Sequence, residues 1–225
     1  MENVSTKVYQ NDGNLTVISH VKKEGARILD IGCGVGDNAR LLVAKGHVID
    51  GITLSPQERD LALEHCRNVY IHNLELGLPM EVLSEKYDYI ICSHILEHIA
   101  FPTNLLLDMH KIAIANLAEV IVALPNLMYY KTRIKILFGN FDYTDSGIMD
   151  YTHLRWYTMK SSTALFESFN FNIKVSFVEG LAPFNRIFSL MSKKAPNFVK
   201  KFLFSMAPTL FGSELILVLN CKVIE

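Results

Sequence analysis

Short apolar runs alternate with helical patterns along the first half of the chain. The runs are β-prone and apolar almost throughout, which is typical of strands covered by helices on both faces. They lie at 27–31, 47–53, 68–73, 87–93 and 119–124, and helical patterns lie between them at 37–45, 56–66 and 102–116. Because strands and helices alternate, the pattern predicts βαβ units and a parallel sheet.

The pattern changes after Pro125. Residues 126–157 are rich in Tyr, Asp, Gly and Asn and are too many for an ordinary connection, which indicates a functional insertion. A helix at 159–170 and strands at 172–178 and 214–223 follow. Between these strands, 183–211 mixes apolar residues with lysines and one arginine, without acids. We therefore expect one domain over 1–225, with an insertion at 126–157 and a helical cover at 183–211.

Composition and charge narrow the class of protein to which the chain can belong. The chain has 225 residues, half of them hydrophobic, and a formal net charge of −1, so no global field favours nucleic acid. Four cysteines stand apart with no C-x-x-C pair, which favours reduced thiols over a disulfide frame or zinc site. Residues 1–14 are polar and predict no signal peptide, and no apolar run reaches the ~20 residues of a membrane span. A cytoplasmic protein is expected.

Three glycines follow the first predicted strand. Gly32, Gly34 and Gly36 stand at spacing two, whereas a dinucleotide fingerprint would need its third glycine where Asp37 stands. Asp30 and Asp37 would repel a pyrophosphate and suit a cationic ligand, such as S-adenosylmethionine (SAM), with its sulfonium and ammonium groups. A bare tight turn is the alternative interpretation, and an NAD(P) oxidoreductase is disfavoured by the spacing.

The run ILDIGCGVG at 28–36 resembles the first motif of class I SAM-dependent methyltransferases, and the order of elements agrees over 27–124. The resemblance implies an α/β, Rossmann-like fold: a mostly parallel seven-stranded sheet with an antiparallel last strand and helices on both faces. It also implies that the Asp30 side chain and the backbone of Gly32, Cys33 and Gly34 border the methionine part of SAM.

The ends of the second and third strands depart from the family pattern. Thr53, followed by Leu54, stands where the family has an acid that binds both ribose hydroxyls, and Gln57 or Glu58 could assist it. Asn73 stands where the family commonly has an Asp for the adenine amino group, with the backbone amide of Leu74 on a ring nitrogen. Asn73 could equally cap its loop.

The segment 93–98, SHILEH, contains H-x-x-E-H, a short pattern that could bind zinc. It also resembles the S-x-x-L-E-H-I segment that borders the pocket after the fourth strand in many class I methyltransferases. We favour that second interpretation and expect no metal site. Ser93 and His94 are then predicted to face the pocket, and His98 to satisfy backbone groups in the turn.

The insertion resembles a subgroup of small bacterial methyltransferases associated with surface-polysaccharide or sugar-nucleotide pathways, and more distantly the methionine-biosynthesis protein W family. Its tyrosines, carboxylates and arginines suit a polar ring such as a sugar, although His153 and Arg155 could simply lock the insertion to the sheet.

We predict methyl transfer from SAM to an oxygen or nitrogen of a small molecule, with a sugar or sugar nucleotide as the candidate acceptor. His153 is the first candidate for the general base and His94 the second. A non-catalytic partner that regulates another enzyme is the alternative. For 183–211, a cover or dimer contact is favoured over contact with a membrane or lipid-linked substrate.

Overall fold

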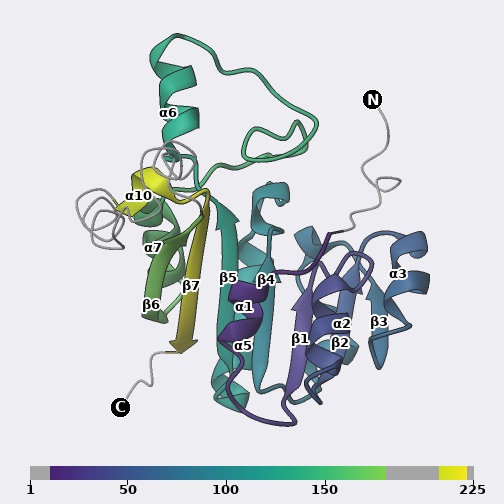
Figure 1. Cartoon of the computed structure of the whole chain (residues 1–225). Helices are drawn as coiled ribbons and strands as arrows, with labels where there is room; N and C mark the ends of the chain where they lie inside the picture. The colour runs from purple at the N-terminus through teal and green to yellow at the C-terminus, as the bar shows by residue number, and fades with distance from the viewer. Residues whose placement is uncertain (1–10, 181–207, 222–225) are drawn as a thin grey trace, which may run out of the picture.

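The computed structural model describes residues 11–180 and 208–221, which form a seven-stranded sheet in the order β3-β2-β1-β4-β5-β7-β6 (Figure 1). The strands are β1 (Arg27–Ile31), β2 (Val48–Thr53), β3 (Asn68–Ile71), β4 (Tyr89–Ser93), β5 (Glu119–Pro125), β6 (Phe171–Glu179) and β7 (Glu214–Cys221). β1 to β5 pair in parallel, and β7 pairs antiparallel with both β5 and β6. The predicted mostly parallel sheet with an antiparallel last strand is confirmed.

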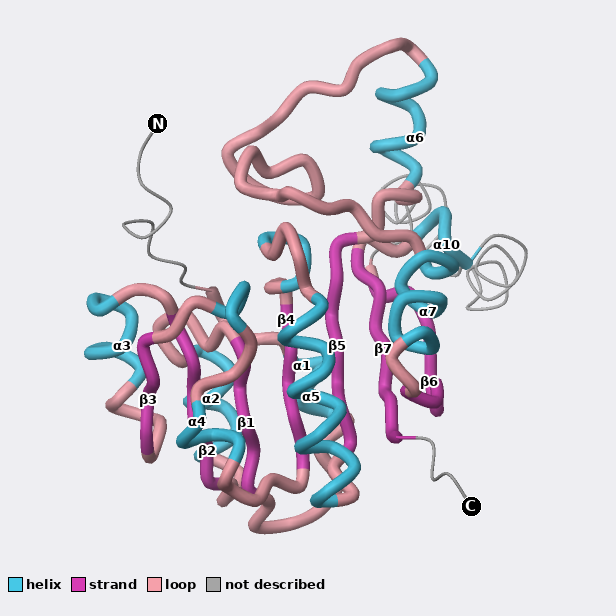
Figure 2. The backbone as a smooth tube through the Cα atoms, turned by 180° about the vertical axis from the view of Figure 1, so that it is seen from behind, coloured by secondary structure: helices cyan, strands magenta, loops and turns pink. Residues whose placement is uncertain are grey.

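Helices cover both faces of the sheet. The helices of one face are α1 (Leu15–Ser19), α2 (Asp37–Val43) and α3 (Pro56–Ala62), which contribute to one buried apolar cluster. Those of the other are α4 (Met80–Leu83), α5 (Thr103–Asn116) and α7 (Met159–Ser168), which contribute to a second cluster. Figure 2 shows α5 in front of the sheet, and Figure 1 shows α1 there, as expected for a three-layer α/β structure.

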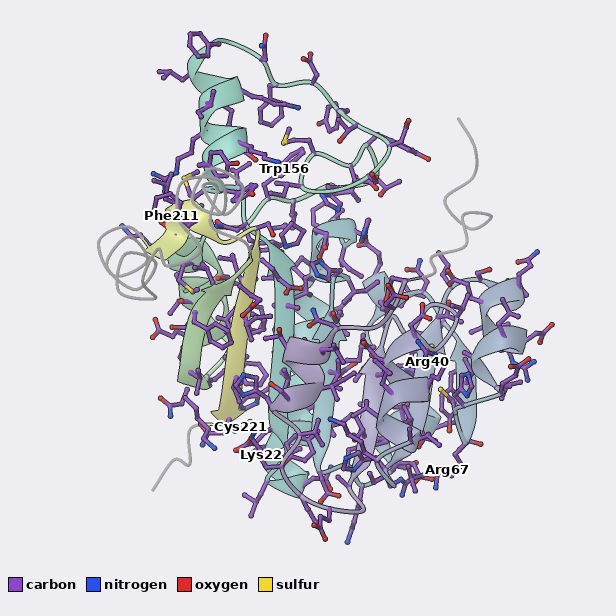
Figure 3. The ribbon with its side chains drawn as sticks, viewed as in Figure 1. Lys22, Arg40, Arg67, Trp156, Phe211 and Cys221 are labelled. Atoms are coloured by element: carbon purple, nitrogen blue, oxygen red, sulfur yellow. The ribbon has the colours of Figure 1, made fainter. Side chains whose placement is uncertain are left out.

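The insertion projects beyond the carboxyl ends of the central strands. It contains α6 (Tyr130–Leu137) and a long loop, which stand above the sheet in Figures 1 and 2. Its base is fixed by Asn126, whose side-chain amide donates to the carbonyls of Thr209 and Gly212, beside α10 (Pro208–Phe211). Within the insertion, Trp156 contacts the rings of Phe141 and Tyr143 (Figure 3).

Most of the predicted cover at 183–211 lies outside the described residues, so that prediction remains open. Within the part of the chain that the structure describes, no helix is both long and apolar enough to cross a membrane.

Candidate cofactor and active site

A cavity of about 610 Å³ opens at the carboxyl ends of β1 to β4, where open α/β sheets bind ligands. Its wall includes most of the residues predicted to contact the cofactor: Gly32, Cys33, Gly34, Thr53, Leu54, Asn73, Leu74 and Ser93. Asp30 lies beneath this wall with its side chain 1% exposed. The structure therefore brings together, at one cavity, loops from four strands.

The glycine loop needs residues without a Cβ. Gly32, Gly34 and Gly36 have φ values of +73°, +53° and +88°, in the left-handed region that favours glycine. A Cβ on Gly32 would lie 2.6 Å from Cδ1 of Ile95. The amide of Cys33 donates to the carbonyl of Ile52 at 2.9 Å, which ties the loop to β2.

Asp30 has a buried carboxylate whose hydrogen-bonding capacity is only partly used. Its Oδ2 accepts no hydrogen bond from the described residues, and burial raises the pKa of this carboxyl to about 7. A cationic group in the adjoining loop would supply the missing interaction, because it would stabilise the ionised form. The glycine cradle and Asp30 therefore fit the aminoacyl part of SAM.

A carboxylate also stands beside the end of β2, although the last residue of the strand, Thr53, has none. Glu58, in the first turn of α3, lines the cavity, and its Oε2 accepts a 2.5 Å hydrogen bond from the Thr53 hydroxyl. Ser55 caps this helix and donates its own amide to the Thr53 Oγ1. A carboxylate on the following helix thus stands beside the strand end and faces the cavity.

Asn73 caps its loop while also lining the cavity. Its Oδ1 accepts a hydrogen bond from the amide of Glu75 at 3.0 Å, at the start of the short 3-10 helix Leu74–Leu76. The capping role is therefore confirmed, and the adenine contact stays a prediction.

His94 lies on the opposite wall of the cavity, in a left-handed conformation with φ +55°. Its Nε2 contacts the Glu214 carboxylate on β7, and its Nδ1 lies 3.3 Å from Glu97 Oε1. Burial alone would lower the pKa of His94, but the two carboxylates outweigh it and raise the pKa to about 10. His94 is thus cationic at neutral pH and would have to lose a proton before it could act as a base.

His153 lies behind this wall. It is 6% exposed, its Nδ1 donates to the carbonyl of Ile148 at 3.0 Å, and its ring centroid is 4.8 Å from that of His98. His98 lines the cavity, whereas none of the described residues of 126–157 does. The two predicted base candidates are therefore not brought together. The proximity of Glu97 and His98 to His153 cannot be predicted from the sequence. The contact that joins the two segments, between His98 and the Thr152 carbonyl, is between residues 54 positions apart.

These features define the cofactor site of a class I SAM-dependent methyltransferase. A family model described as a methyltransferase domain matches residues 6–174, which is more than half of the chain. The chain belongs to this family, and SAM is its cofactor.

One sequence relative is also a methyltransferase. A ubiquinone biosynthesis O-methyltransferase from Paracidovorax citrulli (strain AAC00-1) is 32% identical over 93 residues, which cover 36% of this chain and 36% of the relative. The match thus spans little more than a third of that relative's length.

Two solved structures share the fold. A SAM-dependent methyltransferase from Archaeoglobus fulgidus has a TM-score of 0.62 at 17% identity, covering 92% of this chain and 91% of its own. The magnesium protoporphyrin IX methyltransferase from Synechocystis PCC 6803, with bound SAH, has a TM-score of 0.55 at 14% identity, covering 92% and 78%.

Proposed function

We propose that the protein transfers the methyl group of SAM to an oxygen of a small hydroxylated molecule. The observation that carries this proposal is a cavity lined both by the glycine loop, with Asp30 buried beside it, and by Ser93, His94 and His98. The name O-methyltransferase of the 32% identical relative supports oxygen as the acceptor atom.

SAM supplies an already activated methyl group, so the chain's own task is to align the acceptor and exclude water. Asp30 and the loop at Gly32–Gly34 would hold the aminoacyl end, and Glu58, oriented by Thr53, the ribose hydroxyls. Ser93 and His94 would then border the acceptor side. His94, as a cation held between Glu97 and Glu214, would disfavour cationic acceptors there.

A sugar or sugar nucleotide is the acceptor class that the resemblance of the insertion favours. His153 or His94 as general base also stays a prediction. The resemblance to the protein W family allows the non-catalytic alternative, with Thr53 and Asn73 as mild support, and the Glu58 carboxylate beside Thr53 weakens that support.

The test is turnover of SAM to S-adenosylhomocysteine with panels of nucleotide sugars, other polyhydroxylated molecules and phenols. We expect acceptor-dependent product formation that Asp30→Asn reduces at least tenfold. Methyl transfer only to amines would overturn oxygen as the acceptor atom. Tight SAM binding without turnover on any panel would favour the non-catalytic alternative.

A further inference from the structure

We propose that Glu97, His98 and His153 form a binding site for a divalent transition-metal ion at the wall of the cavity. Glu97 and His98 end the turn after β4, in the 3-10 helix Leu96–His98, and His153 comes from the end of the insertion. One ligand atom from each residue lies within 4.8 Å of the others. Bonds to a metal are about 2.0–2.2 Å long, so binding would draw these atoms together by about 1 Å.

The buried Glu97 carboxylate is the first observation that points to a cation. Glu97 is 1% exposed, and neither of its side-chain oxygens accepts a hydrogen bond from the described residues. His94 Nδ1 approaches Oε1 at 3.3 Å, without hydrogen-bond geometry. The His94 cation therefore faces only one of the two oxygens, and a bound cation would supply the interaction that Oε2 lacks.

Backbone contacts favour, in both histidines, the tautomer that metal ligands commonly have. His98 Nδ1 faces the carbonyl of Thr152 at 3.2 Å, and His153 Nδ1 faces the carbonyl of Ile148 at 3.0 Å. A carbonyl only accepts, so each Nδ1 carries the hydrogen and each Nε2 carries a lone pair. Metal-binding histidines are commonly fixed by this same backbone contact at the second ring nitrogen.

The segments that carry the three residues are already clamped together. The Glu97 carbonyl accepts hydrogen bonds from the amides of Leu154 and Arg155 at 2.8 and 3.0 Å. Arg155 also donates its Nε to the carbonyl of Ala100 at 2.7 Å. Because these contacts do not need an ion, the site is largely formed before one binds.

The donor set indicates which ions fit. Two imidazoles and one carboxylate suit Zn²⁺, Fe²⁺, Mn²⁺ or Co²⁺, whereas Mg²⁺ and Ca²⁺ prefer oxygen ligands alone. Three protein ligands leave coordination positions open, and His98 lies on the cavity wall.

The ion's role, which depends on the proposed function, would be to hold the acceptor hydroxyl oxygen and lower its pKa. An ion on His153 Nε2 would leave this histidine no nitrogen for base catalysis.

The direct test is metal binding to the full chain after EDTA treatment and dialysis. We expect one Co²⁺ per chain with a visible absorption band, and Zn²⁺ to displace it. Glu97→Gln and His153→Gln should each weaken Co²⁺ binding at least tenfold. His65→Gln, on the turn after α3, is the matched control and should bind as the wild type does. A wild type that binds no ion at millimolar Co²⁺, or a Glu97→Gln variant with unchanged affinity, would overturn the proposal.

A second measurement separates a ligand from a structural residue. Glu97→Gln keeps the side-chain shape and removes a charge without hydrogen bonds. The ion-free variant also loses the charge that faces His94, so its own melting temperature does not decide the question. The Zn²⁺ response does: Zn²⁺ should raise the melting temperature of the wild type only. A Zn²⁺ response retained in Glu97→Gln would leave Glu97 a structural role and overturn the site.

Turnover distinguishes this proposal from the proposed function. Co²⁺ binding that needs Glu97, together with no methylation of any acceptor, would leave the metal site standing and remove the methyl-transfer proposal. Methylation that is unchanged by removal of the ion would overturn the ion's role toward the acceptor.

Discussion

Burial of the Asp30 carboxylate lowers the stability of the folded protein above pH 4. Its folded-state pKa is about 7, against an ordinary value of 3.8, because of burial. The unfolded chain therefore loses this proton near pH 4 while the folded chain keeps it, so the free energy of unfolding falls as pH rises from 4 to 7. About three pKa units correspond to about 4 kcal/mol as an upper limit.

Asp30→Asn should remove this cost. At pH 8 and without SAM, we expect the variant to have the higher free energy of unfolding, and its advantage to shrink toward pH 4. Urea unfolding at several pH values measures this, and calorimetry should show at least tenfold weaker SAM binding. A difference from the wild type that does not change with pH would contradict the assignment.

We expect Glu58 to contribute to SAM affinity, although it lies on α3 and not on β2. Glu58→Gln keeps the size of the side chain but removes the charge that accepts from Thr53 and faces the cavity. Hydrogen bonds to charged groups contribute about 1.5–3 kcal/mol, so SAM affinity should fall about tenfold or more by calorimetry. The neighbouring Gln57→Glu, which leaves Glu58 in place, is the control and should bind SAM as the wild type does.

Most of the residues predicted to contact the cofactor line the cavity, because strand ends, glycine spacing and the family resemblance together locate this edge of the sheet. Glu58 was named only as an assistant to Thr53, since the register of α3 against β2 cannot be read from spacing. The grouping of Glu97, His98 and His153 could not be predicted either. It depends on how the end of a long insertion folds back onto the turn after β4, which is a contact between distant segments.

At the scale of elements, the glycine loop and the turn after β4 are in contact. Gly32→Ala should introduce both strain at φ +73° and a clash with Ile95, whereas Gly46→Ala, at φ +84° with nothing within 4 Å of a new Cβ, should introduce strain alone. The strain costs about 1–2 kcal/mol. Urea unfolding should show a larger loss for Gly32→Ala, with SAM binding lost in that variant only. Equal losses in both would contradict the close packing.

Glu214 on β7 contacts His94 in the turn after β4 and favours the protonated, cationic form of its imidazole. Glu214→Gln should lower the pKa of His94 from its value of about 10, which NMR titration of the imidazole would show. The pKa of His94 is raised on folding, so its contribution to stability is present below the ordinary value of 6.5 and is lost as pH rises through 10. In Glu214→Gln this contribution to stability should be lost at a lower pH than in the wild type. An unchanged His94 titration would contradict the contact.

The strands match their predicted ranges closely, and the predicted helix at 102–116 ends as predicted, whereas the other three predicted helices end two to four residues early. The predicted helix at 56–66 ends at Ala62, because its last four residues form a turn in which Cys66 donates to Ala62. α1, α4 and α6 were not predicted. The first two are only five and four residues long, too short for a periodic apolar pattern, and α6 has a single buried residue, Thr132.

At the scale of the whole molecule, the sheet order places four strand ends around one cavity, and the antiparallel β7 closes its far side through Glu214. Alternation of strands and helices is enough to predict a parallel sheet, and the family resemblance implies an antiparallel last strand, but neither predicts the position of β7 between β5 and β6. The path of the insertion above the sheet depends on contacts such as that of Asn126 with Thr209, which no local pattern predicts.

The central claim is that this cavity binds SAM rather than a dinucleotide. The most direct measurement is the melting temperature of the full chain with SAM, S-adenosylhomocysteine and NADH in parallel, each at saturating concentration. We expect the first two to raise it and NADH to leave it unchanged, because ligand binding to the folded state stabilises it by mass action. A rise with NADH alone, or no change with SAM and S-adenosylhomocysteine, would contradict the account.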